Sequence, residues 1–166
     1  NFLSYGENQI IDFEKCNGIT VVEFDPPNFG GKTVLTVDLL LFLFFNTTTK
    51  TQKAEEIFNR FTDKNVVSVK GDIMIDGEEY IIARKIERKK SKAGEWNVKT
   101  ELDFFKKLAD GQLQNFTGEQ RRETENFIKT SIGDMDDFLM TIVTTADRKS
   151  TRLNSSHTDI SRMPSS

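Results

Sequence analysis

Residues 32–45 constrain the fold more than any other stretch, because they have helix length and are apolar on nearly every side. The run Leu39–Phe45 within them contains no polar residue. A helix without a polar face is stable only when it is covered, so we expect it to be buried inside a larger domain. The apolar run is far shorter than the roughly 20 residues that a membrane-spanning helix needs, so it predicts no transmembrane segment.

The residues before this helix predict two short strands, Ile10–Phe13 and Gly18–Phe24, joined by a turn at Asn17-Gly18. The second segment is rich in β-branched and apolar residues, which favours a strand buried on both faces. After the helix, the sequence predicts a short helix at Lys53–Phe61.

Two longer strands are expected at Val66–Ile75 and Glu78–Arg88, because Asp76-Gly77 between them is a strong signal for a two-residue hairpin turn. A third strand is expected at Trp96–Phe104. Trp96 and the phenylalanines are expected in the core rather than as a platform on which nucleic-acid bases stack.

The C-terminal part predicts helices. Thr117 and Gln120 have the spacing of a capping box, and Gly133 is placed to end the helix after Ile132. Asp134 is expected to cap a last segment, Met135–Ala146. The acidic residues there, including Asp136 and Asp137, are better explained as a helix start than as a metal site.

The composition changes after Ala146, where a small, polar and aperiodic segment begins. Asp147–His157 resembles a common sequencing adapter translated in one frame, and Ser161–Ser166 resembles the far end of that adapter. We therefore expect residues 147–166 to be a non-native, disordered tail and residues 1–146 to be part of a longer protein. Without the tail, 19 basic and 24 acidic residues remain. This acidic balance gives no sign of nucleic-acid binding by bulk charge.

The residues Asn28-Phe29-Gly30-Gly31-Lys32-Thr33 lie between the expected buried strand and the buried helix. This is the context of a phosphate-binding P-loop, in which backbone N–H groups and a helix N-terminus hold phosphate oxygens. Lys32 would reach the β- and γ-phosphates, and the Thr33 hydroxyl would ligate Mg²⁺. Pro26 stands where the usual motif has its first glycine and supplies no N–H group.

These residues, with the N-terminal Asn1-Phe2-Leu3-Ser4-Tyr5, resemble the N-terminal half of an SMC-like ABC-type ATPase. The nearest family members are the SbcC-type double-strand-break repair ATPases and the large subunit of phage recombination endonucleases. Tyr80–Arg84 resembles a strand of that family. The resemblance implies an α/β fold, the N-terminal lobe of a P-loop NTPase head, with a mixed sheet, a P-loop helix and an antiparallel hairpin, truncated here.

The sequence departs from the family at several positions. Besides Pro26, Phe29 replaces a glycine and Leu3 replaces a frequent arginine. Asp38 lies one residue beyond the usual acidic position of the helix, so that role is not transferred to it. Ala146 stands where most members have the glutamine that senses the γ-phosphate, although phage members look similar to this chain here.

The resemblance implies ATP and Mg²⁺ as cofactors and a long coiled coil followed by a C-terminal half of the head. The Walker B and catalytic carboxylates would lie in that half. Its implied partners are a second copy of the head, an SbcD-type metal-dependent nuclease subunit, and DNA ends to which ATP controls access. It implies a cytoplasmic protein of a bacterial or phage-infected cell, associated with the nucleoid. We expect the fragment itself to bind nucleotide weakly and to hydrolyse none.

A basic cluster supplies candidate DNA contacts at Arg84, Arg88, Lys89 and Lys90. The alternative is a solvated strand end and turn. Two other functions stay open: another P-loop enzyme such as a nucleotide kinase, and a binding or scaffold protein with a degenerate P-loop. Pro26 and Ala146 keep the scaffold alternative open.

Overall fold

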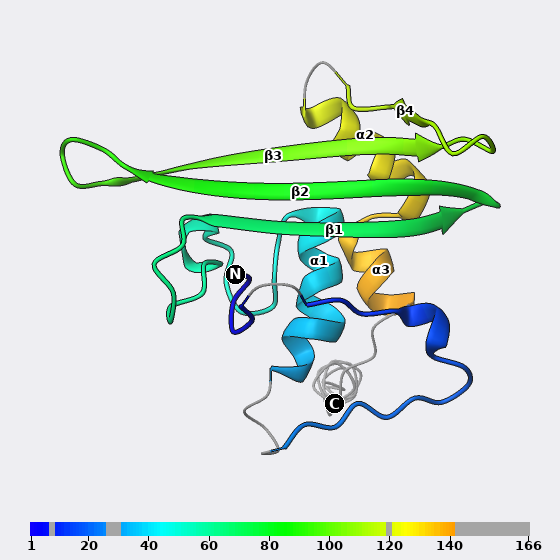
Figure 1. The fold of residues 1–166 in the computed structure, drawn as a ribbon, viewed down its shortest axis with the longest axis horizontal. Coiled ribbons are helices and arrows are strands. Elements are labelled where there is room, and N and C mark those ends of the chain that lie inside the picture. Colours follow the sequence, from blue (N-terminus) through cyan, green and yellow to red (C-terminus); the bar gives the residue numbers. More distant parts are fainter. Residues whose placement is uncertain (7–8, 26–30, 119–120, 142–166) are drawn as a thin grey trace, which may run out of the picture. The chain divides into compact units, whose positions relative to one another are not determined.

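The computed structural model describes residues 1–6, 9–25, 31–118 and 121–141. The chain divides into two compact units, Asn1–Ser131 and Ile132–Ser166. The first unit is built on a four-stranded antiparallel sheet in which neighbouring strands follow chain order (Figure 1). The strands are β1, Val66–Ile75; β2, Glu78–Lys90; β3, Trp96–Lys107; and β4, Leu113–Asn115.

A two-residue turn sets the register of β1 and β2. Asp76 and Gly77 have φ angles of 51° and 80°, and Ile75 pairs with Glu78. Positive φ at both central residues is the geometry of a type I′ turn, whose twist matches that of the flanking strands. The expected hairpin is therefore confirmed, with β2 and β3 extending a few residues beyond their predicted ends.

The apolar helix is present, as predicted, and is buried mainly in its second half. Helical backbone begins at Lys32, passes through a π-helical segment, Val34–Asp38, and continues as α1, Leu39–Phe45. Four consecutive residues of α1, Leu41–Phe44, are buried. The helix contacts β1 and β2 (Figure 1).

One face of the sheet forms the core of the first unit, and buried residues of this face alternate with more exposed ones in parts of β1, β2 and β3. Its buried apolar side chains are Val67, Val69, Ile82, Ile86, Leu102 and Phe104. The opposite face carries charged pairs such as Lys85–Glu101 and Lys107–Glu79. This alternation is typical of an antiparallel sheet with one covered and one solvated face.

The helix α2, Arg121–Ile132, packs on the aromatic part of the covered face. The Phe127 ring lies 5.1 Å from the Phe104 ring, which stacks on Tyr80 at 5.2 Å. Ile128 is buried. Gly133 follows the helix with a φ of 97°, which confirms its predicted role at the helix end.

A buried arginine on β2 joins the sheet to both helices. The Arg84 guanidinium donates hydrogen bonds to the Leu43 carbonyl at 3.1 Å and to the Phe44 carbonyl at 3.4 Å. Its third contact is Glu125 of α2, at 3.5 Å. The last carbonyls of a helix lack helical partners, so Arg84 satisfies groups that burial would otherwise leave unpaired.

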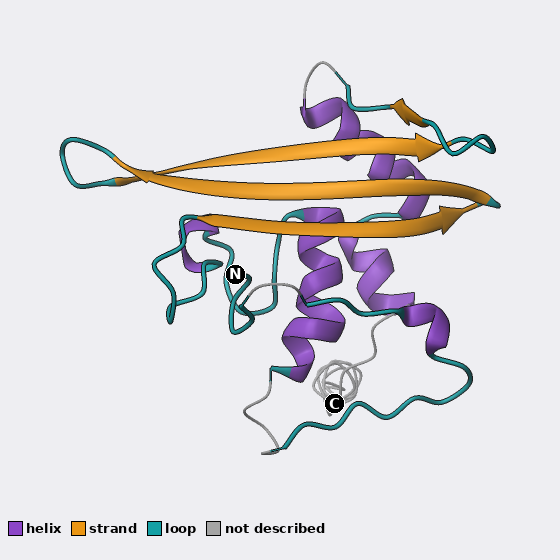
Figure 2. Ribbon diagram, viewed as in Figure 1, coloured by secondary structure: helices purple, strands orange, loops and turns teal. Residues whose placement is uncertain are grey.

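The expected P-loop α/β fold is wrong. Every strand of the sheet is antiparallel and begins at or after Val66, so the sheet contains no strand that leads into the apolar helix. Neither expected strand, Ile10–Phe13 or the buried Gly18–Phe24, is formed. Their backbone is irregular, drawn as loop in Figure 2, except that a 3₁₀ turn, Phe13–Lys15, begins at the end of the first. The Ile19 and Val21 side chains are 98% and 73% exposed. β-Branched sequence favours a strand only where a neighbouring strand accepts its backbone hydrogen bonds, and the described residues place none there.

Other local predictions are corrected as well. The helix expected at Lys53–Phe61 is reduced to a 3₁₀ turn, Ala54–Glu56, and Phe58 forms an isolated bridge with Phe2. Gln120 of the expected capping box lies outside the described residues. The Thr117 hydroxyl oxygen accepts a hydrogen bond of 2.9 Å from the Phe104 N–H.

The second unit contains α3, Met135–Thr141. Its start is as predicted, because the Asp134 carboxylate accepts a hydrogen bond of 2.9 Å from the Asp137 N–H. Residues 142–146 of the expected segment and the predicted tail, residues 147–166, lie outside the described residues. No helix among the described residues is long and apolar enough to cross a membrane.

Arg84→Ala should lower the free energy of unfolding by about 3 kcal/mol, because it leaves two buried carbonyls without their donor and removes one of the two arginines paired with Glu125. The matched control is Lys85→Ala, the next residue, which lies on the solvated face in an exposed pair and should cost less than about 1 kcal/mol. Urea unfolding of both variants measures the difference. Equal unfolding midpoints would show that Arg84 does not hold the helices.

Gly71→Ala should destabilise the protein by about 1–3 kcal/mol, because a Cβ at Gly71 would meet the Leu43 side chain at the interface of α1 with β1. Leu43→Ala removes that obstacle while creating a cavity of its own. A double-mutant cycle followed by thermal unfolding should therefore show that the double variant loses less stability than the two single changes added together. Simple additivity would contradict this packing.

Candidate phosphate-binding site

Gly31 is required by both its backbone and its neighbours. Its φ angle is 69°, and an added Cβ would lie 2.5 Å from the Ser4 hydroxyl oxygen and 3.2 Å from the Tyr5 ring. The Tyr5 hydroxyl donates a hydrogen bond of 3.3 Å to the Gly31 carbonyl. Burial raises the pKa of Tyr5, so this hydroxyl keeps its proton at neutral pH. The N-terminal residues thus hold the glycine that precedes the helix.

Lys32 and Thr33 occupy the first turn of this helix. Among the described residues, the helical backbone hydrogen bonds begin with that from the Leu35 N–H to the Gly31 carbonyl, at 3.1 Å. The carbonyls four positions before the N–H groups of residues 32–34 belong to residues 28–30, outside the described residues. Thr33 is exposed, and the half-buried Lys32 forms no ion pair with any described residue. The dipole of a helix N-terminus and an ammonium without an ion-pair partner among the described residues favour an anion.

Four of the residues that the sequence assigns to this site are not part of the described structure. Asn28, Phe29 and Gly30 of the predicted phosphate loop, and Pro26 at its start, lie outside the described residues. The described part of the candidate site is therefore Gly31, Lys32 and Thr33. Ala146, expected at the γ-phosphate sensor, also lies outside.

The middle of this helix is π-helical. In Val34–Asp38 the Leu39 N–H bonds to the Val34 carbonyl, five residues back. A π turn holds one residue more than an α turn.

Asp38 is buried within this segment. One of its carboxylate oxygens, Oδ1, accepts a hydrogen bond of 2.6 Å from the Thr49 N–H. The other, Oδ2, has no hydrogen-bond partner among the described residues. Asp38 thus ties the middle of the helix to the polar loop that follows α1.

A cavity of about 280 Å³ lies beside the start of the helix. Ser4, which faces Gly31, and Val34 of the helix are in its wall. Two cations, Lys50 and Arg60, contribute to the same wall, while Lys32 and Thr33 do not. Leu3 also lines it. Its remaining lining residues are Thr51, Glu56, Phe58 and Phe61.

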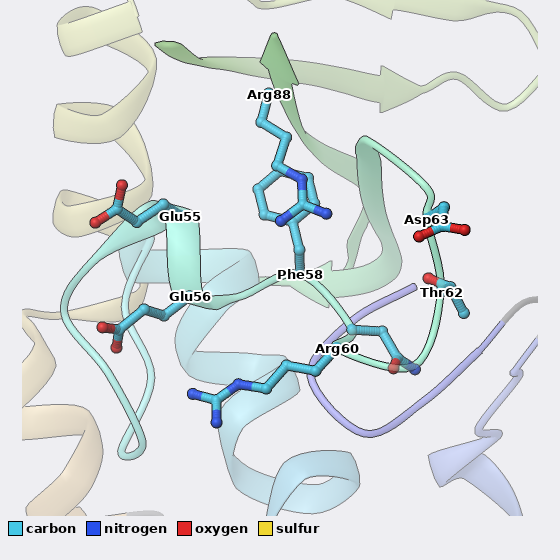
Figure 3. Close-up of a pocket in the computed structure, with 8 residues that line it drawn as sticks. Glu55, Glu56, Phe58, Arg60, Thr62, Asp63 and Arg88 are labelled. Carbon is cyan, nitrogen blue, oxygen red and sulfur yellow. The ribbon is translucent and has the colours of Figure 1, made fainter. Parts of the chain in front are cut away.

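A second cavity, of about 370 Å³, is lined by Arg88 and by the segment before β1 (Figure 3). No sequence motif predicts this cavity, because its walls come from two separate segments, residues 55–63 and Arg88 of β2. The Arg88 guanidinium lies over the Phe58 ring, 4.5 Å from its centre. The wall of the cavity also contains Arg60 and three carboxylates, Glu55, Glu56 and Asp63.

The candidate DNA contacts separate into two groups. Arg84 is fully buried, and its guanidinium is engaged by Leu43, Phe44 and Glu125, so it is withdrawn as a DNA contact. Arg88 is half-buried, and Lys89 and Lys90 are exposed at the end of β2. The four residues share one strand, but alternation and the packing of α1 and α2 place Arg84 inside the core.

No group of three or more His, Cys, Asp or Glu side chains that could hold a metal ion occurs within the described ranges. A Mg²⁺ ion at this site would therefore depend on the Thr33 hydroxyl, the phosphates of the ligand and water, as Mg²⁺ commonly does in nucleotide sites.

Comparison with known proteins identifies no family. No family model matches the sequence. The chain is 28% identical over 145 residues to a protein described as "Uncharacterized protein R555" of Acanthamoeba polyphaga mimivirus. The match covers 85% of this chain and 10% of that protein. The chain therefore spans about a tenth of the length of this giant-virus relative.

Proposed function

We propose that the chain binds the phosphates of ATP at Gly31, Lys32 and Thr33, as part of the ATP-binding head of a DNA repair or recombination ATPase. The proposal concerns the function and not the fold, since the described residues form an antiparallel sheet with helices. The observation that carries it is the direct passage from Gly31, with its positive φ, into a helix that begins with Lys32 and Thr33.

The physical argument is local to the helix start. The N–H groups at the start of a helix point toward its N-terminal end, and the helix dipole adds partial positive charge there. Lys32 brings a full positive charge that no described carboxylate neutralises. Thr33 is exposed and offers a hydroxyl for Mg²⁺, which would bridge the same phosphates.

The neighbouring cavity supports the same ligand class. It begins at Ser4, beside Gly31, and its wall includes the cations Lys50 and Arg60. An anionic ligand bound at the helix start would find further positive charge there. The Phe58 and Phe61 side chains in the same wall offer apolar surface to the less polar part of a nucleotide.

The whole protein's activity belongs to the proposal as well. A relative about ten times as long as the matched segment has room for the coiled coil and the second half of a head. In that arrangement two heads would enclose ATP, and a metal-dependent nuclease subunit would act on DNA ends. This chain would supply phosphate binding, and the carboxylates for hydrolysis would come from elsewhere in the longer protein.

Lys32→Ala should weaken binding of Mg²⁺-ATP about 10- to 100-fold, because it removes a charge-assisted contact to phosphate. Isothermal titration calorimetry on the full chain measures this. Lys70→Ala is the matched control, since Lys70 is an exposed lysine on the solvated face of β1 and should leave the affinity unchanged. Equal ATP affinity of the wild type and Lys32→Ala, or an ATP affinity that does not depend on Mg²⁺, would contradict the proposed site.

A further inference from the structure

The β2–β3 hairpin extends beyond the rest of the sheet at one end. Pairing of β1 with β2 begins at Val66 and Glu87, whereas pairing of β2 with β3 continues to Lys90 and Trp96. The strand pairing of β1 therefore does not extend to residues 88–96, here called the hairpin tip. In Figure 1 the tip is the loop that projects at the left end of β2 and β3.

The hairpin tip carries more positive than negative charge. Its cations are Arg88, Lys89, Lys90 and Lys92, and its one acidic residue is Glu95. Lys89 is paired with Glu87 at 3.1 Å, on the solvated face. Arg88, Lys90 and Lys92 form no ion pair with any described residue, so their charges are available to an anionic partner.

An aromatic ring lies among these cations. Trp96 pairs with Lys90 across the hairpin and is 42% exposed, so it is not the core residue that the sequence predicts. The Arg88 guanidinium lies 4.7 Å and the Lys90 ammonium 5.8 Å from the centre of a Trp96 ring. A partly exposed aromatic ring beside cations is the arrangement by which proteins stack a nucleic-acid base while neutralising its phosphates.

Arg88 is held in place before any ligand arrives. Its guanidinium lies between the rings of Phe58 and Trp96, and its Nε donates a hydrogen bond of 3.0 Å to the Asn65 side chain. Its two terminal nitrogens have no hydrogen-bond partner among the described residues. A guanidinium fixed at Nε, with both terminal nitrogens open, is suited to two phosphate oxygens.

The cavity that Arg88 lines is unfavourable for a phosphate group. Glu55, Glu56 and Asp63 contribute three carboxylates to its wall, and they would repel a phosphodiester backbone (Figure 3). The backbone would therefore run along the hairpin tip and not into the cavity. Stacking on Trp96 also needs a base that has left its own stack, which a single strand provides and an intact duplex does not.

We propose that the hairpin tip binds single-stranded DNA, with a base stacked on Trp96 and phosphates held by Arg88, Lys90 and Lys92. The proposal rests on the DNA-related function proposed above and is independent of the phosphate site at Lys32. It adds Trp96 and Lys92 to the candidate DNA contacts and replaces the buried Arg84.

Trp96 is the only tryptophan of the chain, so its fluorescence reports directly on the tip. Titration of the full chain with oligothymidylate, without ATP, should quench this fluorescence. A duplex of the same length should bind more weakly. Three neutralised phosphates predict a slope of about −2 in a plot of log affinity against log salt concentration. Absence of binding, or equal binding of duplex and single strand, would overturn the proposal.

Variants separate stacking from charge, with anisotropy of a labelled oligothymidylate as the readout. Trp96→Leu should weaken binding about 5- to 100-fold, and Trp96→Phe should retain most of the affinity. Lys90→Glu with Lys92→Glu should weaken it further and flatten the salt slope. Lys15→Glu with Lys70→Glu is a control of equal charge change at exposed lysines outside the tip. Equal weakening by both charge pairs would mean that bulk charge alone governs binding and would overturn the assignment to the tip.

The ATP site is tested separately in the same preparations. Lys32→Ala should bind oligothymidylate with unchanged affinity, and Trp96→Leu should bind Mg²⁺-ATP with unchanged affinity. If wild-type protein does not bind Mg²⁺-ATP but oligothymidylate quenches Trp96, the proposed ATP site is wrong and the hairpin tip is supported. If it binds Mg²⁺-ATP but oligothymidylate does not quench Trp96, the ATP site is supported and the assignment to the tip is wrong.

Discussion

The buried Arg84 guanidinium is the interaction on which the first unit depends. It starts from the middle of β2, donates hydrogen bonds to the last carbonyls of α1, and reaches Glu125 of α2. Burial lowers the pKa of Arg84 to about 10, and the charge of Glu125 opposes this shift, so the side chain stays protonated at neutral pH. A charge without solvent is tolerated because helix carbonyls, with their partial negative charge, and a carboxylate surround it.

The hydrogen bonds of Arg84 to α1 also help to position the candidate site. The helix that Arg84 holds at its C-terminal end is the same one whose first turn carries Lys32 and Thr33. Asp38 ties its middle to the following loop through the Thr49 N–H, and Ser4 and Tyr5 close around Gly31. The helix start is therefore positioned by contacts along its whole length, which is the preorganisation that binding of a phosphate group needs.

The sequence predicts the local elements of this fold better than their assembly. The Asp76-Gly77 turn, the buried helix from Lys32 and the helix end at Gly133 are each specified by neighbouring residues, and all three are confirmed. Gly18–Phe24 has strand composition but no strand beside it, and a sheet depends on distant partners that local pattern does not reveal. The same limit applies to function: GGKT is visible in sequence, whereas the burial of Arg84 and the exposure of Trp96 follow from packing.

The central claim is that a nucleotide's phosphates bind where this helix begins. Amide chemical shifts of the ¹⁵N-labelled chain, recorded with and without a non-hydrolysable Mg²⁺-ATP analogue, test it most directly. The account predicts that the largest shifts fall on Gly31, Lys32, Thr33 and Val34, with smaller ones at Ser4 and Tyr5. Unchanged amides at these residues in the presence of saturating nucleotide would contradict it.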